Sequence, residues 1–468
     1  MMKVKVIDAP CGAGKTTWAI QEMCHNTERE YIYCTPFLDE ITRIRNACGK
    51  DRFYEPVNFD CSKIESFNEL LQERCSVAVT HSTFLNTTPE TIDYISSGKY
   101  VLILDEVLDV VQQFNDTQLV QSDIKQQISD ADIDMLINQK LISIDDNKLV
   151  HWIGNSYEGG KFSVVERLAK LKRLYYPRNT LLVCVFPPEV FRVLDEIYVM
   201  TYRFEHSTLR AYFELFDIPY ELASVHKDDE GEYCVCDYDD SIDIAYRRKL
   251  SSLVTVRDSC NFDDMQERVP ISRMFCTAWW QDNKRSKPET LTQLCKYIDS
   301  FIEGLRKQYG NVSVKDEAIM WTCPKDGKSK LKYGKRFGRA KTLSTMSKDE
   351  FNRLDDKVKA AKLDSFVPCN MKASNIYSNR WVLIYLCNLF YNPVIKGLFV
   401  DDNPTRIANG QRPIILDDDE FALSALIQWM CRSRLRNDQP IQLYLPSKRM
   451  RNLYFSWINE ALEFERPA

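Results

Sequence analysis

A short apolar strand, a glycine-rich loop and a helical pattern follow one another directly at the amino terminus of the chain. The strand is predicted over residues 4–7, and the loop after it contains Gly12 and then Gly14-Lys15-Thr16. Glycines let backbone N–H groups surround phosphate oxygens at the start of a helix, so this arrangement predicts a phosphate-binding loop. A glycine-rich strand-to-helix turn without a ligand is the alternative.

The residue types in this loop fit a nucleoside triphosphate. Lys15 is expected to reach the β- and γ-phosphates, and the Thr16 hydroxyl to ligate Mg²⁺. Ala9 stands where the first glycine of the pattern is usual, and alanine is tolerated there in many phosphate loops. Base selectivity for ATP is not demonstrated. The loop predicts ATP as substrate with Mg²⁺, and six ATP-binding residues: Gly12, Ala13, Gly14, Lys15, Thr16 and Thr17.

A second apolar strand, predicted over residues 101–104, ends directly in Asp105 and Glu106. An aspartate at a strand end can hold Mg²⁺, and the glutamate beside it can polarise the water that attacks the γ-phosphate. A kinase needs no water-activating glutamate, so the pair favours hydrolysis. We therefore predict Lys15 and Glu106 as catalytic residues and Thr16 and Asp105 as metal ligands, with two acids in a solvated turn as the alternative.

Short apolar runs alternate with helical stretches along most of the chain. This pattern predicts an α/β protein whose mostly parallel sheets are covered by helices on both faces. Its 468 residues are enough for two or three domains. We predict a first domain over residues 1–205, an acidic linker or insertion over 206–270, and a second domain over 271–468.

The charges of the chain are unevenly distributed, although its net charge is only −5. Residues 1–270 hold 29 Lys and Arg against 45 Asp and Glu, whereas the rest of the chain holds 33 against 22. A basic half is expected to face a phosphate backbone, although solvated helix faces produce the same asymmetry. Eight cations lie within residues 325–341, and we predict nucleic-acid contacts from four of them: Lys330, Lys332, Lys335 and Arg336.

The sixteen cysteines are scattered and no export signal is seen, so reduced thiols are expected. Cys234 and Cys236 lie close together with His226 nearby, but no CxxC motif completes a zinc site and none is predicted there. The longest apolar run, residues 381–387, is far shorter than the ~20 residues that span a bilayer. A cytoplasmic protein with no membrane partner is expected.

Two further predicted strands are followed at once by small hydroxyl residues. Thr35-Pro36 follows one of them, and Thr80-His81-Ser82 follows the other. Taken in order with the phosphate loop and the Asp-Glu pair, these segments resemble the first domain of the superfamily 2 helicases. In that family the two segments hold the nucleic-acid backbone, and helix capping by hydroxyls is the alternative. The resemblance implies this role for Thr35, Pro36, Thr80, His81 and Ser82.

Two positions resemble the family through their place in the order of motifs. Thr201 ends the last strand of the first half, where these helicases carry a Ser-Ala-Thr segment that couples hydrolysis to strand movement. Asn375 lies in a stretch, residues 370–377, similar to one in helicases encoded by bacteriophages. The resemblance implies a coupling role for Thr201, or a plain strand-to-linker turn, and a nucleic-acid contact for Asn375.

Residues 428–436 resemble the family's Gln-x-x-Gly-Arg-x-x-Arg box. Cys431 replaces the glycine, and the last arginine is one place beyond the usual spacing. An arginine of this box would neutralise charge on the γ-phosphate in the transition state. The resemblance implies ATP contact by Gln428 and an arginine finger at Arg432, with Arg436 as the second candidate and a cationic helix end as the alternative.

The resemblance covers nearly the whole chain apart from residues 225–270, and it implies two RecA-like domains that use ATP and Mg²⁺. The expected function is a helicase or translocase that acts on DNA, with RNA as the alternative polymer. Replication or recombination proteins are further expected partners, in the host cytoplasm if the chain is viral. Two other functions stay open: a viral DNA-packaging ATPase, and an NTP-gated scaffold that binds nucleic acid without turnover.

Overall fold

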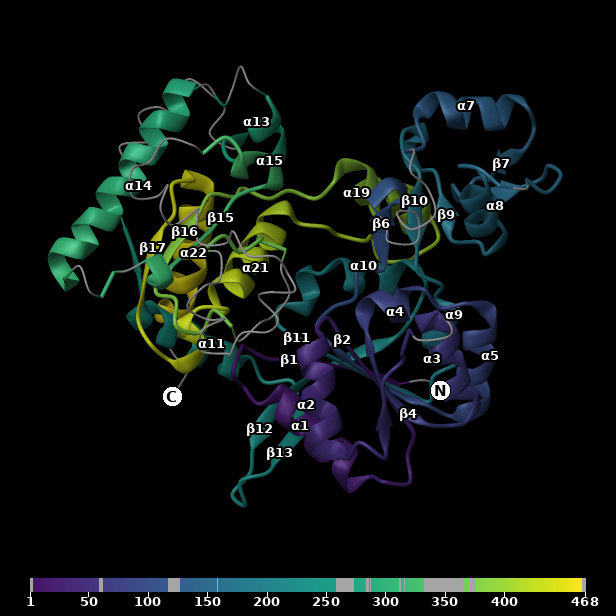
Figure 1. Cartoon of the computed structure of the whole chain (residues 1–468), viewed down its shortest axis with the longest axis horizontal. Coiled ribbons are helices and arrows are strands. Elements are labelled where there is room, and N and C mark those ends of the chain that lie inside the picture. Colours follow the sequence, from purple (N-terminus) through teal and green to yellow (C-terminus); the bar gives the residue numbers. More distant parts are fainter. Residues whose placement is uncertain are drawn as a thin grey trace. The chain divides into compact units, whose positions relative to one another are not determined.

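The chain folds into two compact units, which the computed structural model describes separately (Figure 1). Unit 1 comprises Met1–Ala9, Ala13–Tyr238 and Tyr391–Asp417, and unit 2 comprises Pro10–Gly12, Asp239–Phe390 and Asp418–Ala468. The structure describes residues 3–58, 62–116, 127–157, 159–257, 273–282, 286, 288–310, 313–314, 316–331, 365–370 and 376–464.

Unit 1 is built around an eight-stranded sheet with the order β13-β12-β1-β11-β5-β2-β4-β3. Neighbouring strands are parallel, except for β12 and β13. Parallel strands end at the same edge of a sheet, which is where α/β proteins bind ligands. The strands are β1 (Lys3–Asp8), β2 (Tyr31–Thr35), β3 (Phe53–Tyr54), β4 (Ser76–Thr80), β5 (Val101–Asp105), β11 (Glu196–Thr201), β12 (Tyr220–Lys227) and β13 (Tyr233–Asp237).

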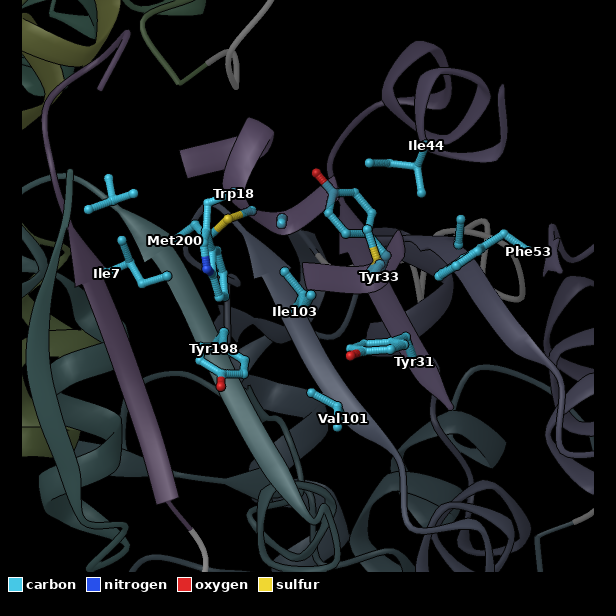
Figure 2. Packing of buried hydrophobic residues seen from close by; sticks show 14 of the residues in the cluster. Ile7, Trp18, Tyr31, Tyr33, Ile44, Phe53, Val101, Ile103, Tyr198 and Met200 are labelled. Carbon is cyan, nitrogen blue, oxygen red and sulfur yellow. The ribbon is translucent and has the colours of Figure 1, made fainter. Parts of the chain in front are cut away.

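Both faces of this sheet are covered. On one face, Trp18 packs against Tyr198 of β11, and Ile44 belongs to the same buried cluster as Tyr31 and Tyr33 of β2 (Figure 2). Ile32, between the two tyrosines, points to the other face and is equally buried. Burial on both faces explains why these strands are continuous apolar runs. The helices of this part are α1 (Lys15–His25), α2 (Leu38–Cys48), α3 (Lys63–Gln72), α4 (His81–Leu85), α5 (Pro89–Gly98), α9 (Glu189–Arg192) and α10 (Thr208–Leu215).

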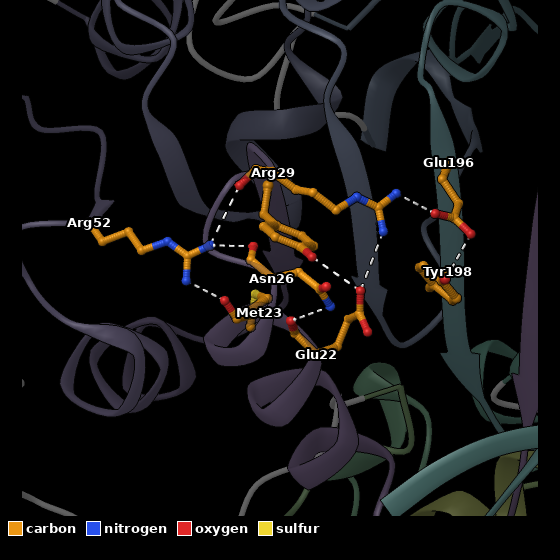
Figure 3. A network of polar contacts seen from close by, with 8 residues as sticks. Glu22, Met23, Asn26, Arg29, Arg52, Glu196 and Tyr198 are labelled. Carbon is orange, nitrogen blue, oxygen red and sulfur yellow. Dashed lines mark hydrogen bonds and ion pairs between the residues drawn. The ribbon is translucent and has the colours of Figure 1, made fainter.

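A network of polar contacts lies at the edge of the sheet where its parallel strands begin, next to the carboxyl end of α1 (Figure 3). Arg29 lies between Glu22 of α1 and Glu196 of β11, with N–O distances of 3.4 and 2.5 Å. Arg52 donates to backbone carbonyl groups at the end of α1. These contacts fix the carboxyl end of α1 on the strands, so the loop at its amino end starts from an anchored helix.

Residues 111–185, which lie between β5 and β11 in the chain, form an insertion with its own hydrophobic core. Its described core includes Phe114, Leu136, Phe162 and Leu168. The run 181–186 is as apolar as the strands of the main sheet, but it contains β10 of a separate antiparallel sheet, because it pairs with β6 and β9. The elements are β6 (Val111–Gln113), α7 (Asp130–Asn138), β7 (Ile142–Ile144), β8 (Val150–Trp152), α8 (Ser163–Lys170), β9 (Leu174–Tyr175) and β10 (Val183–Val185).

Unit 2 contains a four-stranded parallel sheet with the order β14-β17-β16-β15. The predicted α/β class with mostly parallel sheets is therefore confirmed. No helix of the described residues is long and apolar enough to cross a bilayer. The elements are α11 (Asp240–Leu253), β14 (Val254–Val256), α13 (Thr277–Gln281), α14 (Pro288–Tyr309), β15 (Ile319–Thr322), α15 (Lys325–Lys328), β16 (Val382–Tyr385), α21 (Asp418–Met430), β17 (Ile441–Tyr444) and α22 (Lys448–Glu463).

The units differ from the predicted ranges in two places. Residues 206–238 are not a linker, because α10 and the hairpin of β12 and β13 extend unit 1. Residues 391–417 belong to unit 1 although they follow β16, and they carry α19 (Pro393–Val400) and α20 (Asn403–Ala408). Arg178 holds this segment through two hydrogen bonds of 2.6 Å to Asp401. Periodicity predicts such helices but not the unit on which they pack.

Candidate functional site

The loop after β1 contains two glycines and ends at the start of α1. Gly12 and Gly14 have φ angles of 82° and 97°, a conformation that favours glycine. Gly14 is the N-cap of α1, and it has no side chain that could bind the first N–H groups of the helix. Lys15 donates to the carbonyl oxygen of Ala9, so its ammonium group lies back over the loop. This is the geometry of an anion site made from backbone.

Asp105 lies at the end of β5, on the same edge of the sheet as the loop. Burial and the neighbouring carboxylates of Glu106 and Glu40 raise the pKa of Asp105 to about 7, and the charge of Lys15 opposes this shift. The Thr35 hydroxyl donates to Asp105 at 3.3 Å. The parallel order of β1, β11 and β5 brings the loop and this carboxylate to the same edge of the sheet, which makes them candidates for one site.

Glu106 has a φ of 69°, a left-handed conformation that is uncommon outside glycine. Its N–H donates to the carbonyl oxygen of Met200 at 2.9 Å, which fixes the turn after β5.

The site also fits a magnesium ion. Mg²⁺ prefers hard oxygen ligands, and the Asp105 carboxylate and the Thr16 hydroxyl are of this kind. Burial and the neighbouring carboxylates disfavour the charged form of Asp105.

β11 lies between β1 and β5 and is bonded to the loop. The N–H of Ala9 donates to the carbonyl oxygen of Thr201 at 3.0 Å. Asp8, the last residue of β1, accepts the N–H groups of Arg203 and Phe204 at 2.6 and 2.9 Å. Sequence reasoning missed Asp8, and a carboxylate directly before the loop is the only local signal for it. Thr201 ends β11, the strand between the one that precedes the phosphate loop and the one that ends at Asp105. Its role in coupling stays a prediction.

Two of the residues predicted to hold nucleic acid in unit 1 are buried and contact Asp105, and their nucleic-acid role stays a prediction. Thr35 is fully buried, and its described side-chain bond is the one to the Asp105 carboxylate. His81 is also buried, and its Nε2 lies 3.0 Å from the Asp105 carbonyl oxygen. These contacts orient the end of β5, which the family resemblance did not lead us to expect.

The other three residues of this group differ in exposure. Thr80 is the N-cap of α4 and accepts the N–H of Thr83 at 3.2 Å, as in the capping alternative. Pro36 is half-buried and Ser82 is exposed. A nucleic-acid contact by these residues stays a prediction, and Ser82 has the most accessible side chain of them.

In unit 2 the Gln-Arg segment spans the end of α21 and the turn after it. Arg432 is buried, and its charge opposes the rise in pKa that burial causes at Tyr385, so its guanidinium lies near the end of β16. Arg434 is engaged elsewhere, because it lies 5.0 Å from the Trp381 ring centroid and donates to the Pro440 carbonyl oxygen at 2.5 Å. Its contacts are structural, which supports Arg432 over Arg434 as the functional arginine.

The remaining predicted residues of unit 2 are placed less completely. Gln428 and Arg436 are half-buried, one before and one after Arg432. Lys330 donates to the Trp280 carbonyl oxygen and, at 3.1 Å, to the Ser286 hydroxyl, so it is bound within unit 2. Four predicted nucleic-acid residues lie outside the described residues: Lys332, Lys335, Arg336 and Asn375.

The chain is similar to proteins derived from phage. Residues 124–184 match a family described as the YonV middle domain, and residues 248–458 match one described as the YonV C-terminal Rossmann-like domain. A relative from Bacillus subtilis (strain 168), the SPbeta prophage-derived uncharacterized protein YonV, is 30% identical over 471 residues. That similarity covers 98% of this chain and 99% of the relative.

Solved structures with a similar chain path are also known. An XPD helicase has a TM-score of 0.47 at 12% identity, covering 100% of this chain and 96% of that one. Xpd4 of S. tokodaii has a TM-score of 0.45 at 11% identity, covering 97% and 93%. The DUF1998 helicase MrfA bound to DNA has a TM-score of 0.36 at 9% identity, covering 97% of this chain and 46% of that one.

Proposed function

The chain belongs to the YonV family, and we propose that it is a nucleic-acid-dependent ATPase that uses hydrolysis to move along or unwind its polymer. One observation carries the proposal. The phosphate loop with Lys15 and the Asp105-Glu106 pair lie at one edge of one sheet, and β11 between them is hydrogen-bonded to both. The order of the motifs along the chain, which resembles superfamily 2 helicases, supports a nucleic acid as the polymer.

Each group at this edge has a defined part in the proposed reaction. The loop N–H groups and Lys15 bind the triphosphate and offset its charge. Thr16 and Asp105 would hold Mg²⁺, which when bound neutralises charge on the phosphates. Glu106 orients the attacking water and accepts its proton. Thr35 acts as a positioning residue, because it contacts the Asp105 carboxylate rather than the substrate.

Arg432 is the proposed source of the cation that stabilises charge on the γ-phosphate in the transition state. Arg434 is bound to Trp381 and Pro440, and Arg436 is the second candidate. Without such a residue the site could bind ATP but would turn it over slowly. The arginine therefore distinguishes a motor from an NTP-gated scaffold.

The polymer is proposed to be DNA, with RNA as the alternative. The basic second half of the sequence supports a polyanionic partner. The prophage-derived relative supports a phage setting. Replication or recombination proteins are the proposed partners, and the host cytoplasm is the proposed location. No observation favours a packaging role over this one.

Hydrolysis of ATP by the full chain, alone and with single-stranded or duplex DNA or RNA, tests the proposal. We expect Mg²⁺-dependent hydrolysis that single-stranded DNA stimulates and that Lys15→Ala abolishes. Lys50→Ala, at an exposed position, is the matched control and should leave the rate unchanged. ATP binding without turnover in any of the four conditions would favour the scaffold, and absence of ATP binding would refute the site.

A further inference from the structure

We propose that Tyr233, on the hairpin of β12 and β13, is the platform on which the base of the bound nucleotide stacks. The inference rests on the proposed function and adds the part of the site that contacts the nucleoside. The loop and the Asp-Glu pair account for the phosphates and the ion, but neither offers a surface for a base.

The hairpin extends past the carboxyl edge of the sheet beside the loop. β12 pairs in parallel with β1 as far as Ala223, which lies opposite Ile7, and then continues to Lys227. β13 returns antiparallel, with Tyr233 opposite Lys227. The tip of the hairpin therefore lies beyond the last residues of β1, and β13 contacts α1 (Figure 1).

The strand order decides on which side of β1 the nucleoside must lie. Asp105 and Glu106 follow β5, which is on the β11 side of β1. β12 and β13 are on the opposite side of β1. A triphosphate whose γ-phosphate points to Glu106 therefore carries its nucleoside toward the hairpin.

Tyr233 is the hairpin residue that contacts the phosphate loop. A Cβ on Gly14 would lie only 2.0 Å from Cε1 of the Tyr233 ring, so the ring lies directly against the end of the loop. The Tyr233 N–H donates to Oε1 of Gln21 at 3.0 Å, which fixes the strand on α1. Tyr233 as a residue is only half-buried, so part of its surface is accessible to a ligand, and the Nζ of Lys227 lies 5.8 Å from the centroid of its ring.

The chemistry of the hairpin suits a nucleoside better than a phosphate. Its tip carries four acids, which would repel a phosphate chain: Asp228, Asp229, Glu230 and Glu232. An aromatic ring stacks on any base, most strongly on the larger purines, and does not need hydrogen bonds to do so. Val235 packs against the same core with an aliphatic side chain, so covering α1 does not itself require a ring at position 233.

The test is binding of two ligands to the full chain with Mg²⁺: ATP, and inorganic tripolyphosphate, which lacks the nucleoside. Tyr233→Leu keeps an apolar side chain against α1 but removes the ring. We expect it to weaken ATP binding by about 5- to 100-fold, the range of a lost base-aromatic stack, and to leave tripolyphosphate binding unchanged. The preference for ATP over UTP should fall in the same variant, and Tyr233→Phe should restore it.

Val235→Ala on the same strand is the matched control, since it also trims apolar packing on α1, and should change neither affinity. The inference is overturned if Tyr233→Leu binds ATP as tightly as the unmodified chain does. It is also overturned if ATP and tripolyphosphate weaken together, because the ring would then only support the loop. Failure of the unmodified chain to bind either ligand would instead refute the proposed function itself.

Discussion

The carboxyl edges of the two sheets carry different residues. In unit 1, five parallel strands end in a carboxylate or a hydroxyl residue: Asp8, Thr35, Thr80, Asp105 and Thr201. In unit 2, β16 and β17 end in the buried tyrosines Tyr385 and Tyr444. In the proposed function, the first edge binds phosphate and metal with residues of its own strands, whereas the second supplies charge from a residue that follows a helix.

That residue is Arg432, and its position depends on more of the fold than a strand end does. Asp105 is fixed by the pairing of β5 with β2 and β11 on both sides. Arg432 follows α21, whose place is set by the packing of many buried side chains along the helix. The residues proposed to act at the first edge can therefore be recognised from short sequence motifs. The position of Arg432 at the second edge depends on tertiary packing.

Among the variants that compare the two edges, Arg432→Ala is expected to have the largest effect and tests the second edge. It should lower the nucleic-acid-stimulated kcat for ATP by ~10³-fold, the scale of an arginine finger, and leave ATP affinity nearly unchanged. Steady-state hydrolysis and equilibrium ATP binding would separate the two effects. Arg434→Ala is the matched control: its contacts with Trp381 and Pro440 predict lower stability with kcat retained. A ~10³-fold loss in Arg434→Ala and none in Arg432→Ala would reverse the assignment.

Glu106→Gln tests the first edge and should have the next largest effect. The substitution keeps the shape of the side chain and the bond from its N–H to Met200, but it removes the proton acceptor. We expect ATP to bind normally and to be hydrolysed at least ~10²-fold more slowly, as for loss of a general base. Asp109→Asn, at an exposed acid three residues further on, should hydrolyse ATP at the normal rate. Normal turnover by Glu106→Gln would assign the base elsewhere.

The local part of the site could be predicted from the sequence. Gly14 and Lys15 stand between a strand and a helix, and Asp105 ends an apolar run, so neighbours in the chain reveal them. Contacts between distant residues could not be predicted. Asp8 and Arg203 are 195 positions apart, and no periodicity connects them. Thr35 carries a hydroxyl in the expected place, but only the fold shows that it faces Asp105 from 70 residues away.

The same limit applies to the fold. Alternating strands and helices are local patterns, and they predicted the α/β class. The run 181–186 is as apolar as a main-sheet strand, yet it contains β10 of the insertion, because pairing partners and not composition decide the sheet. Residues 391–417 were assigned to the second half by sequence position, but Arg178 and other polar groups hold them on unit 1.

Arg29→Met tests the opposite, amino edge of the sheet in unit 1, where the polar contacts hold the structure together and no chemistry is proposed. Burial tends to raise the pKa of Glu196, but the hydrogen bonds from Arg29 and Tyr198 and the charges of Arg29 and Lys5 together outweigh it, so that pKa lies below its ordinary value of 4.5. A carboxylate with a lowered pKa stabilises the fold above its ordinary value, and this contribution is lost as the pH falls through the lowered one.

We therefore expect Arg29→Met to lower the free energy of unfolding by about 1 kcal/mol at neutral pH, and by much less well below pH 4.5. Urea unfolding at several pH values measures this. Lys5→Met, which removes a more exposed pair with Glu221 at 3.9 Å, is the matched control and should have a smaller effect. The kcat for ATP hydrolysis should be unchanged in both Lys5→Met and Arg29→Met. A loss of kcat in Arg29→Met would mean that the amino edge also takes part in function.

The basic stretch of residues 325–341 should give the smallest effect, one on nucleic-acid affinity alone. Replacing Lys332, Lys335 and Arg336 together by Gln should flatten the slope of log K against log salt by up to ~0.7 for each phosphate of a single strand that is no longer neutralised. Basal ATP hydrolysis should not change. Lys330→Gln is the informative comparison, because Lys330 is bound to Trp280 and Ser286 and its replacement should lower stability rather than salt dependence. An unchanged slope in the triple variant would mean that the stretch is a solvated surface, and that the positive charge of unit 2 acts elsewhere.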